Sequence, residues 1–132
     1  MKRLSFTLFL SLFYFCCFAG YDLLFCTKAD SLGNCKGKGE TFAWKDDKTS
    51  LELIVMNKDS IGLPKLKFKL YAMKNDREGE LYAELSLYLN PRSLFGVKKM
   101  RFYKPGYYKV EVLDDKDGIL TTGFVTLSDR EE

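Results

Sequence analysis

The 132-residue chain contains no histidine. Ser-His-Asp and Cys-His catalysis are therefore excluded, as are imidazole-ligated zinc and the side chain that most often transfers protons near neutral pH. An enzyme with this sequence would need other catalytic groups, such as a pair of carboxylates in a cleft. The acidic residues lie mostly in expected turns, where carboxylates are usually solvated. We therefore expect no enzymatic activity and no cofactor, and a carboxylate-based hydrolase is the least favoured alternative.

Cysteine is also scarce, with four residues in the whole chain. Cys26 and Cys35 are the two that lie outside the N-terminal apolar run, and eight residues separate them, unlike the C-x-x-C spacing of redox motifs. Two cysteines without histidine do not complete a standard four-ligand zinc site, even if Asp30 contributes an oxygen. We expect no metal site and predict a Cys26–Cys35 disulfide, which would close a loop of ten residues.

Long hydrophobic runs are confined to the N-terminus. Lys2 and Arg3 precede an uncharged stretch over residues 4–20, which is typical of a secretory signal peptide. We predict a signal peptide over residues 1–20 and one domain over residues 21–132. Two alternatives stay open: a retained membrane anchor, or a lipoprotein acylated at Cys16 or Cys17. Contact with the membrane follows only from these alternatives. In every case the domain lies outside the cytoplasm, in the periplasm, on the cell surface or secreted.

The net charge of +3 contains Lys2 and Arg3. Without residues 1–20 the chain has 19 basic and 18 acidic residues, a difference of +1. This balance gives no global argument for binding nucleic acid, and we expect none.

The remaining sequence reads as short strands separated by turns, without a long amphipathic helical pattern or a repeat. Apolar or alternating runs occur at residues 49–56, 65–73, 80–89, 97–103, 107–113 and 119–127, with weaker candidates at 21–27 and 41–44. Seven or eight such strands predict an all-β protein built as a single antiparallel β-sandwich.

Individual strands carry more detailed expectations. The run at 49–56 is largely apolar and contains branched residues, which indicates burial on both faces. Residues 65–73 alternate, with Leu66, Phe68, Leu70 and Ala72 on one face and lysines on the other. In residues 80–89, where a helix is the competing interpretation, the same alternation places these side chains together: Leu81, Ala83, Leu85, Leu87 and Leu89. Gly123 is expected to mark a β-bulge.

The segment "FYKPGYYKVEVLDDKDGIL", which starts at Phe102, contains the pattern Gly106-x-Tyr108-x-Val110-x-Val112. From Phe102 to about Val125 the chain resembles the penultimate strand pair of immunoglobulin-like domains in exported bacterial proteins. The resemblance implies an immunoglobulin-like sandwich and transfers no known activity.

Residues 114–118, "DDKDG", are expected to form a hairpin turn. A calcium loop of the EF-hand type with its glycine at Gly118 would require an acid at position 113 and a glutamate at position 124, which are Leu113 and Phe124 here.

Basic residues concentrate on two of the expected strands, and we take them as candidate binding residues for an anionic ligand. They would form one positive patch if the two strands were neighbours, although exposed lysines also protect sheets against edge-to-edge aggregation. Five tyrosines are either an exposed contact surface or caps of the core. The basic candidates are Lys65, Lys67, Lys69, Lys98, Lys99, Arg101 and Lys104, and the tyrosines are Tyr71, Tyr82, Tyr88, Tyr103 and Tyr107.

Together these features predict an exported, non-catalytic binding or accessory protein of a bacterial cell envelope. Its expected partners are an envelope protein or an anionic glycan or lipid surface, and an adhesin is one version of this role. The alternative is a structural subunit of an envelope assembly that contacts its partner through an exposed edge strand.

Overall fold

The computed structural model describes residues 20–74 and 77–129. Nearly all of the predicted signal peptide, including Cys16 and Cys17, lies outside the described residues. Within the described part, no helix is long and apolar enough to cross a membrane. The strands are β2 (Tyr21–Cys26), β3 (Lys28–Ala29), β4 (Cys35–Lys36), β5 (Thr41–Ala43), β6 (Ser50–Asn57), β7 (Lys65–Lys74), β8 (Arg77–Tyr88), β9 (Phe95–Arg101), β10 (Gly106–Leu113) and β11 (Ile119–Ser128).

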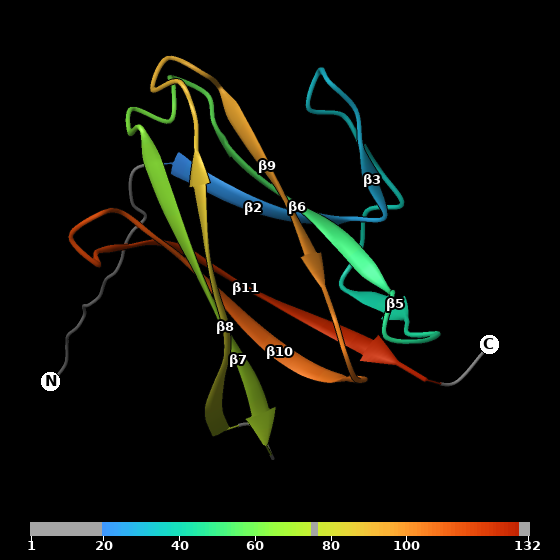
Figure 1. The fold of residues 1–132 in the computed structure, drawn as a ribbon. Helices are drawn as coiled ribbons and strands as arrows, with labels where there is room; N and C mark the ends of the chain where they lie inside the picture. Colours follow the sequence, from blue (N-terminus) through green and yellow to red (C-terminus); the bar gives the residue numbers. More distant parts are fainter. Residues whose placement is uncertain (1–19, 75–76, 130–132) are drawn as a thin grey trace, which may run out of the picture.

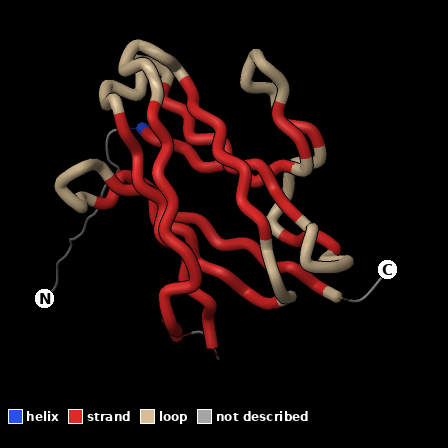
Figure 2. Tube along the Cα trace, in the orientation of Figure 1, coloured by secondary structure: helices blue, strands red, loops and turns tan. Residues whose placement is uncertain are grey.

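The strands form two packed sheets and one small hairpin (Figure 1). The larger sheet has the order β5-β11-β10-β7-β8, and the smaller has the order β2-β6-β9. Most neighbours are antiparallel, and the loops lie at the ends of the strands, as Figure 2 shows. The predicted antiparallel, immunoglobulin-like β-sandwich is confirmed.

The N-terminal part of the chain contributes to both sheets. β2 pairs with β6 in the three-stranded sheet, whereas β5 pairs in parallel with the end of β11 in the five-stranded sheet. The crossing segment is bonded on both sides: the Gly39 amide donates to the Phe25 carbonyl at 3.2 Å, and the Thr126 amide donates to the Glu40 carbonyl at 2.8 Å. Residues 38–40 therefore tie the two sheets together at this edge.

The core lies between the sheets and is built by the predicted alternation. Leu66, Phe68 and Leu70 of β7 have no exposed surface, while the lysines between them face outward. β6 contributes Leu51, Leu53 and Val55 from the opposite sheet. Burying such side chains completely contributes about 1.5–3 kcal/mol each, so the inward faces of these strands contribute strongly to stability.

β8 departs from the predicted pattern at Leu81, which is 50 % exposed. The pairing register jumps from Leu70↔Ala83 to Tyr71↔Leu81, which leaves Tyr82 as an extra residue. This bulge reverses the faces of the strand, because side chains alternate with a period of two. The prediction that Leu81 shares a face with Ala83 was therefore wrong, and Tyr82 packs against the core instead.

Gly123 also has a different role from the predicted one. The pairing of β11 with β10 is regular through Gly123, and the irregularity lies near Leu113. A Cβ atom at Gly123 would lie 3.0 Å from Leu23 Cδ2 and 3.0 Å from Phe25 Cε2. Glycine is needed here because β2 and β11 approach each other closely, so the expected bulge at Gly123 was wrong.

Candidate binding surfaces

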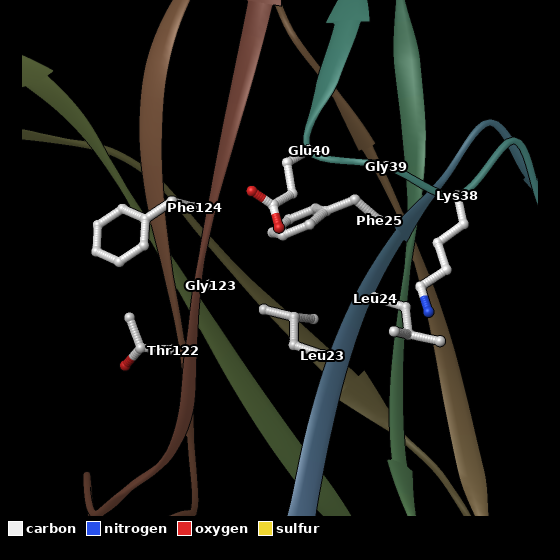
Figure 3. A pocket seen from close by; sticks show the side chains of 9 residues that line it. All are labelled: Leu23, Leu24, Phe25, Lys38, Gly39, Glu40, Thr122, Gly123 and Phe124. Atoms are coloured by element: carbon white, nitrogen blue, oxygen red, sulfur yellow. The ribbon is translucent and has the colours of Figure 1, made fainter.

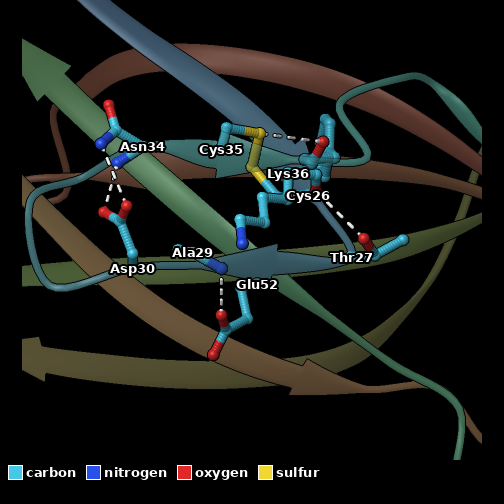
Figure 4. Close-up of a disulfide and its surroundings, with 9 residues drawn as sticks. Cys26, Thr27, Ala29, Asp30, Asn34, Cys35, Lys36 and Glu52 are labelled. Atoms are coloured by element: carbon cyan, nitrogen blue, oxygen red, sulfur yellow. Dashed lines mark hydrogen bonds between the residues drawn. A yellow bond between two sulfur atoms is a disulfide. The ribbon is translucent and has the colours of Figure 1, made fainter.

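The Cys26–Cys35 disulfide is formed, as predicted, with a Cα–Cα distance of 5.5 Å. It joins the end of β2 to β4 and so anchors the β3–β4 hairpin (Figure 4). At the tip of that hairpin, the Asp30 carboxylate accepts hydrogen bonds from the Leu32 amide and from the backbone and side-chain nitrogens of Asn34. The bonds from Asn34 are the main reason that the pKa of Asp30 is lowered. The loop is closed on itself by these contacts.

The hairpin lies against the outer face of the three-stranded sheet. The Ala29 amide donates to a carboxylate oxygen of Glu52 on β6, and Gly33 lies against the Phe95 ring, where a Cβ would be 2.9 Å from the ring carbons. Ile54, on the same outer face of β6, has no exposed surface. β6 is thus covered on both faces, with Ile54 fully buried on the outer one, as its largely apolar run predicts.

The two groups of basic residues do not form one patch. Lys65, Lys67 and Lys69 lie on β7 in the five-stranded sheet, whereas β9, which carries the second group, pairs with β6 in the other sheet. The condition for a single patch, that the two strands are neighbours, is not met. The sequence pattern shows which face each lysine takes but carries no information on which strands pair.

The β7 lysines lie among acidic and aromatic side chains. Lys67 forms a 2.7 Å ion pair with Asp117, which raises the pKa of Lys67 and lowers that of Asp117. Lys69 lies opposite Glu84 on one neighbouring strand and Glu111 on the other. Lys65 Nζ is 5.4 Å from the centre of the Tyr88 ring, and Tyr88 on β8 is the residue directly opposite Lys65 in the sheet. Nearby acids therefore balance much of the positive charge on this face.

The basic residues around β9 have fewer acidic neighbours, although Lys99 lies opposite Glu52 of β6. By strand alternation Lys98 shares the side of Met100, which is in the core, while Lys99 and Arg101 lie on the opposite face. Lys104 follows in the exposed turn before β10. Within residues 20–74 and 77–129 none of these four cations forms an ion pair.

The tyrosines divide between the core and the surface. Tyr82 packs with its ring centre 5.0 Å from that of Tyr108, and its hydroxyl accepts a 2.7 Å hydrogen bond from the Tyr103 amide. Tyr88 and Tyr103 are 72 % and 59 % exposed, and Tyr107 is 40 % exposed. Some of these tyrosines are therefore exposed and Tyr82 packs against the core, so the two interpretations apply to different residues.

One end of the outer face of the five-stranded sheet carries an apolar cluster, here called the aromatic patch: Tyr71, Leu81, Tyr107 and Phe124. Tyr71 pairs with Leu81 on one side, and across the sheet the Tyr107 and Phe124 rings stack at 5.8 Å with 14° between their planes. Lys109 lies between, with Nζ 5.2 Å from the Tyr71 ring centre and 3.2 Å from a carboxylate oxygen of Glu111. The alternation in "TTGFVTL" places Phe124 on the outward face, so the sequence could have predicted its exposure. No sequence pattern indicates the bulge that exposes Leu81.

A groove of about 390 Å³ lies along the edge where β2 and β11 approach each other (Figure 3). This edge groove is lined by Leu23, Leu24, Phe25, Lys38, Gly39, Glu40, Thr122, Gly123 and Phe124. In Figure 3, Leu23 and Phe25 point from β2 toward β11, while the Phe124 side chain points away from the groove. The apolar floor thus comes from β2, and the far wall comes largely from the backbone of β11.

No family model matches the chain, and no curated protein matches it. Among solved structures, the chain is similar to the CARDB domain of a Pyrococcus furiosus protein, which was crystallised in complex with di-metal ions. The two share 20 % sequence identity, and the match has a TM-score of 0.41 and covers 84 % of this chain and 96 % of that chain. In the part of this chain that the structure describes, no three acidic or cysteine side chains are grouped so as to hold a metal ion.

Proposed function

We propose that this protein is a non-catalytic binding or accessory module that works outside the cytoplasm, at a bacterial cell envelope, and contacts a protein partner through the aromatic patch. The observation that carries the proposal is the exposure of Tyr107 and Phe124 on an open sheet face. Aromatic side chains are enriched at the centres of protein interfaces, with polar residues around them.

The surroundings of the patch support a protein partner over a polyanion. Lys67 and Lys109 each have a carboxylate within ion-pair distance, so this face offers both charge signs rather than a positive field. Mixed charges around apolar side chains suit the polar rim of a protein interface. The lysines of β7 then serve as rim residues and contribute orientation more than affinity.

The location outside the cytoplasm is supported by two independent features. The Cys26–Cys35 disulfide fits an oxidising compartment, because cytosolic thiols are normally kept reduced. The basic start and uncharged run over residues 1–20 fit a secretory signal. A fusion of residues 1–20 to a reporter that is active only after export tests this part, and a reporter left in the cytoplasm contradicts it.

The patch is tested with a double variant, Tyr107→Ser with Phe124→Ser, used as bait in native envelope extract. We expect the wild-type protein to capture a defined envelope protein and the double variant to lose it. Tyr103→Ser is the control, because Tyr103 is even more exposed than the two patch residues but lies in the turn after β9. Equal capture by the double variant would show that the patch is not the contact surface.

A second candidate is contact with an anionic glycan or lipid through the unpaired cations around β9. Lys99, Arg101 and Lys104 have no ion-pair partner in the described part of the chain, which favours them over the balanced β7 lysines. We expect their joint reversal to glutamate to abolish salt-sensitive retention on a polyanion column, and the same reversal of Lys65, Lys67 and Lys69 to have a smaller effect. A wild-type protein that passes through at low salt would eliminate this candidate.

A further inference from the structure

We infer that the edge groove between β2 and β11 is a docking site for an extended segment of another protein, which adds to the five-stranded sheet beside β11. This site shares Phe124 with the aromatic patch, because the backbone of Phe124 borders the groove while its side chain points away from it, and the inference does not depend on the proposed function. The argument rests on which backbone groups of β11 and β2 are left without partners.

β11 is paired along its whole length by β10 but only at its end by β5. β5 covers Thr126, Leu127 and Ser128. The Thr126 amide points to the β5 side, where it bonds to the Glu40 carbonyl. Backbone groups alternate between the two edges of a strand, and the register with β10 is regular here, so those of Thr122 and Phe124 point to the same side.

The described residues provide no hydrogen-bond partner on that side for the backbone of Thr122 or Phe124. The facing edge of β2 also has backbone groups without hydrogen-bond partners in the described chain. The Phe25 carbonyl is bonded there to the Gly39 amide, so the groups of Leu23, two residues earlier, also point into the groove, and the described chain leaves them unpaired. Alternating free N–H and C=O groups along a strand edge are complementary to one other structure, an extended polypeptide backbone.

The groove limits the length and shape of what binds. Residues 38–40 close one end by bonding to both sheets, which leaves about five residues of β11, from Leu120 to Phe124, for pairing. Five extended residues span roughly 17 Å. We assign the recess to a single strand, because a second copy of this domain would have to bring a sandwich of two sheets, spaced about 10 Å apart, against the same edge.

The side chains of the groove define the chemistry of the segment. Leu23 and Phe25 form an apolar floor that accepts one apolar side chain. At the closed end Lys38 and Glu40 are exposed, and neither has an ion-pair partner in the described chain. The fitting segment therefore has an apolar residue on one face and charged residues toward the end that meets Lys38 and Glu40.

The decisive substitution is Thr122→Pro, with Thr122→Val as its matched control. Proline removes the free N–H from the groove edge and leaves the bonds to β10 in place, because the Thr122 backbone points away from β10. Valine changes the side chain but keeps the N–H. A displayed library of linear peptides is selected on the immobilised full chain, and the binding of a selected synthetic peptide is then measured on all three proteins.

We expect the peptide to bind the wild type and Thr122→Val alike and to lose at least about tenfold in affinity on Thr122→Pro, since the peptide loses a hydrogen bond and meets the proline ring. If no peptide is enriched, or if Thr122→Pro binds as well as the wild type, the inference is overturned. A concentration-dependent dimer that Thr122→Pro abolishes would also overturn it, because the occupant would then be a second copy of this chain.

Amide exchange in the wild-type protein gives a second readout, which holds even if Thr122→Pro fails to fold. We expect the Thr122 and Phe124 amides to exchange rapidly in the free protein and slowly with the peptide bound. Protection of these amides in the free protein, or no change on binding, would contradict the site. The Tyr107→Ser variant changes the aromatic patch but no residue that lines the groove, and it should still bind the peptide, so failure of the aromatic patch is distinguishable from failure of the groove.

Discussion

The hydroxyl of Tyr108 donates a 2.7 Å hydrogen bond to the backbone carbonyl of Lys104, four residues earlier in the chain. The Tyr108 ring is 1 % exposed and packs 5.0 Å from the ring of Phe102. This contact joins the turn before β10 to the core and has the arrangement of the tyrosine corner of immunoglobulin-like domains, in which a tyrosine near a strand start bonds to backbone a few residues upstream. It gives a physical role to the tyrosine in the pattern Gly106-x-Tyr108.

Replacing Tyr108 with phenylalanine tests this corner. The ring keeps its packing, but the Lys104 carbonyl loses its donor, so we expect a loss of about 1 kcal/mol in the free energy of unfolding and a fall of about 4–8 °C in Tm. Thermal and urea denaturation measure both quantities. Tyr107→Phe is the control, because the neighbouring Tyr107 is on the open face, and an equal loss in both variants would show that the corner bond contributes nothing specific.

The same phenol predicts a dependence of stability on alkaline pH. Burial, with a further contribution from Tyr82, raises the pKa of Tyr108 well above its ordinary value. The unfolded phenol loses its proton near pH 10 while the folded one retains it, so this contribution is complete below about pH 10 and is lost as the pH rises further. We expect urea midpoints to fall less between about pH 9 and pH 11 in Tyr108→Phe than in the wild type. Equal slopes would contradict the assignment.

On the acidic side, the Lys67–Asp117 pair makes the corresponding prediction. The hydrogen bond from Lys67 lowers the pKa of Asp117, so its contribution to stability is present above the unfolded pKa of 3.8 and is lost as the pH falls through the lower folded value. Asp117 also has a φ of +66°, which asparagine tolerates. We expect Asp117→Asn to flatten the decrease of Tm below about pH 5. A decrease as steep as that of the wild type would show that other carboxylates account for it.

Much of the fold follows from local sequence patterns. The alternation in residues 65–73 correctly predicts the inner and outer faces of β7, because Leu66 and Phe68 must be buried together. The largely apolar run of β6 likewise predicts its burial on both faces. Where one face of a strand must be buried, the pattern of apolar residues predicts which face it is.

The errors arise where the structure depends on partners distant in the chain. The bulge beside Tyr71 turns Leu81 outward, and nothing within residues 80–89 records the register of the neighbouring strand. Gly123 is required by the approach of Leu23 and Phe25, about 100 residues earlier in the sequence. The edge groove was missed for the same reason, since unpaired backbone groups are a property of strand order and not of side chains.

The disulfide gives a prediction that bears on both stability and location. Removing it as Cys26→Ala with Cys35→Ala should cost about 2.5–3 kcal/mol in the chain-entropy model for a ten-residue loop. We expect the wild-type protein to lose a similar amount on reduction, measured by urea denaturation, while reductant leaves the double variant unchanged. Alkylation of both thiols without prior reduction, in protein from its native source, would show that the bond is absent there.

The approach of β2 to β11 can be tested at Gly123. In Gly123→Ala the new Cβ would lie 3.0 Å from Leu23 Cδ2 and Phe25 Cε2, so the two strands must move apart or the side chains must leave their rotamers. Overpacking of this kind typically costs 1–3 kcal/mol, and we expect about that loss in urea denaturation. Gly39→Ala is the matched control, because its Cβ would meet the Phe42 ring at an ordinary 3.7 Å. If both variants were equally stable, β2 and β11 would have to be farther apart than the structure places them. The placement of Leu23 and Phe25 as the floor of the edge groove would then also be wrong.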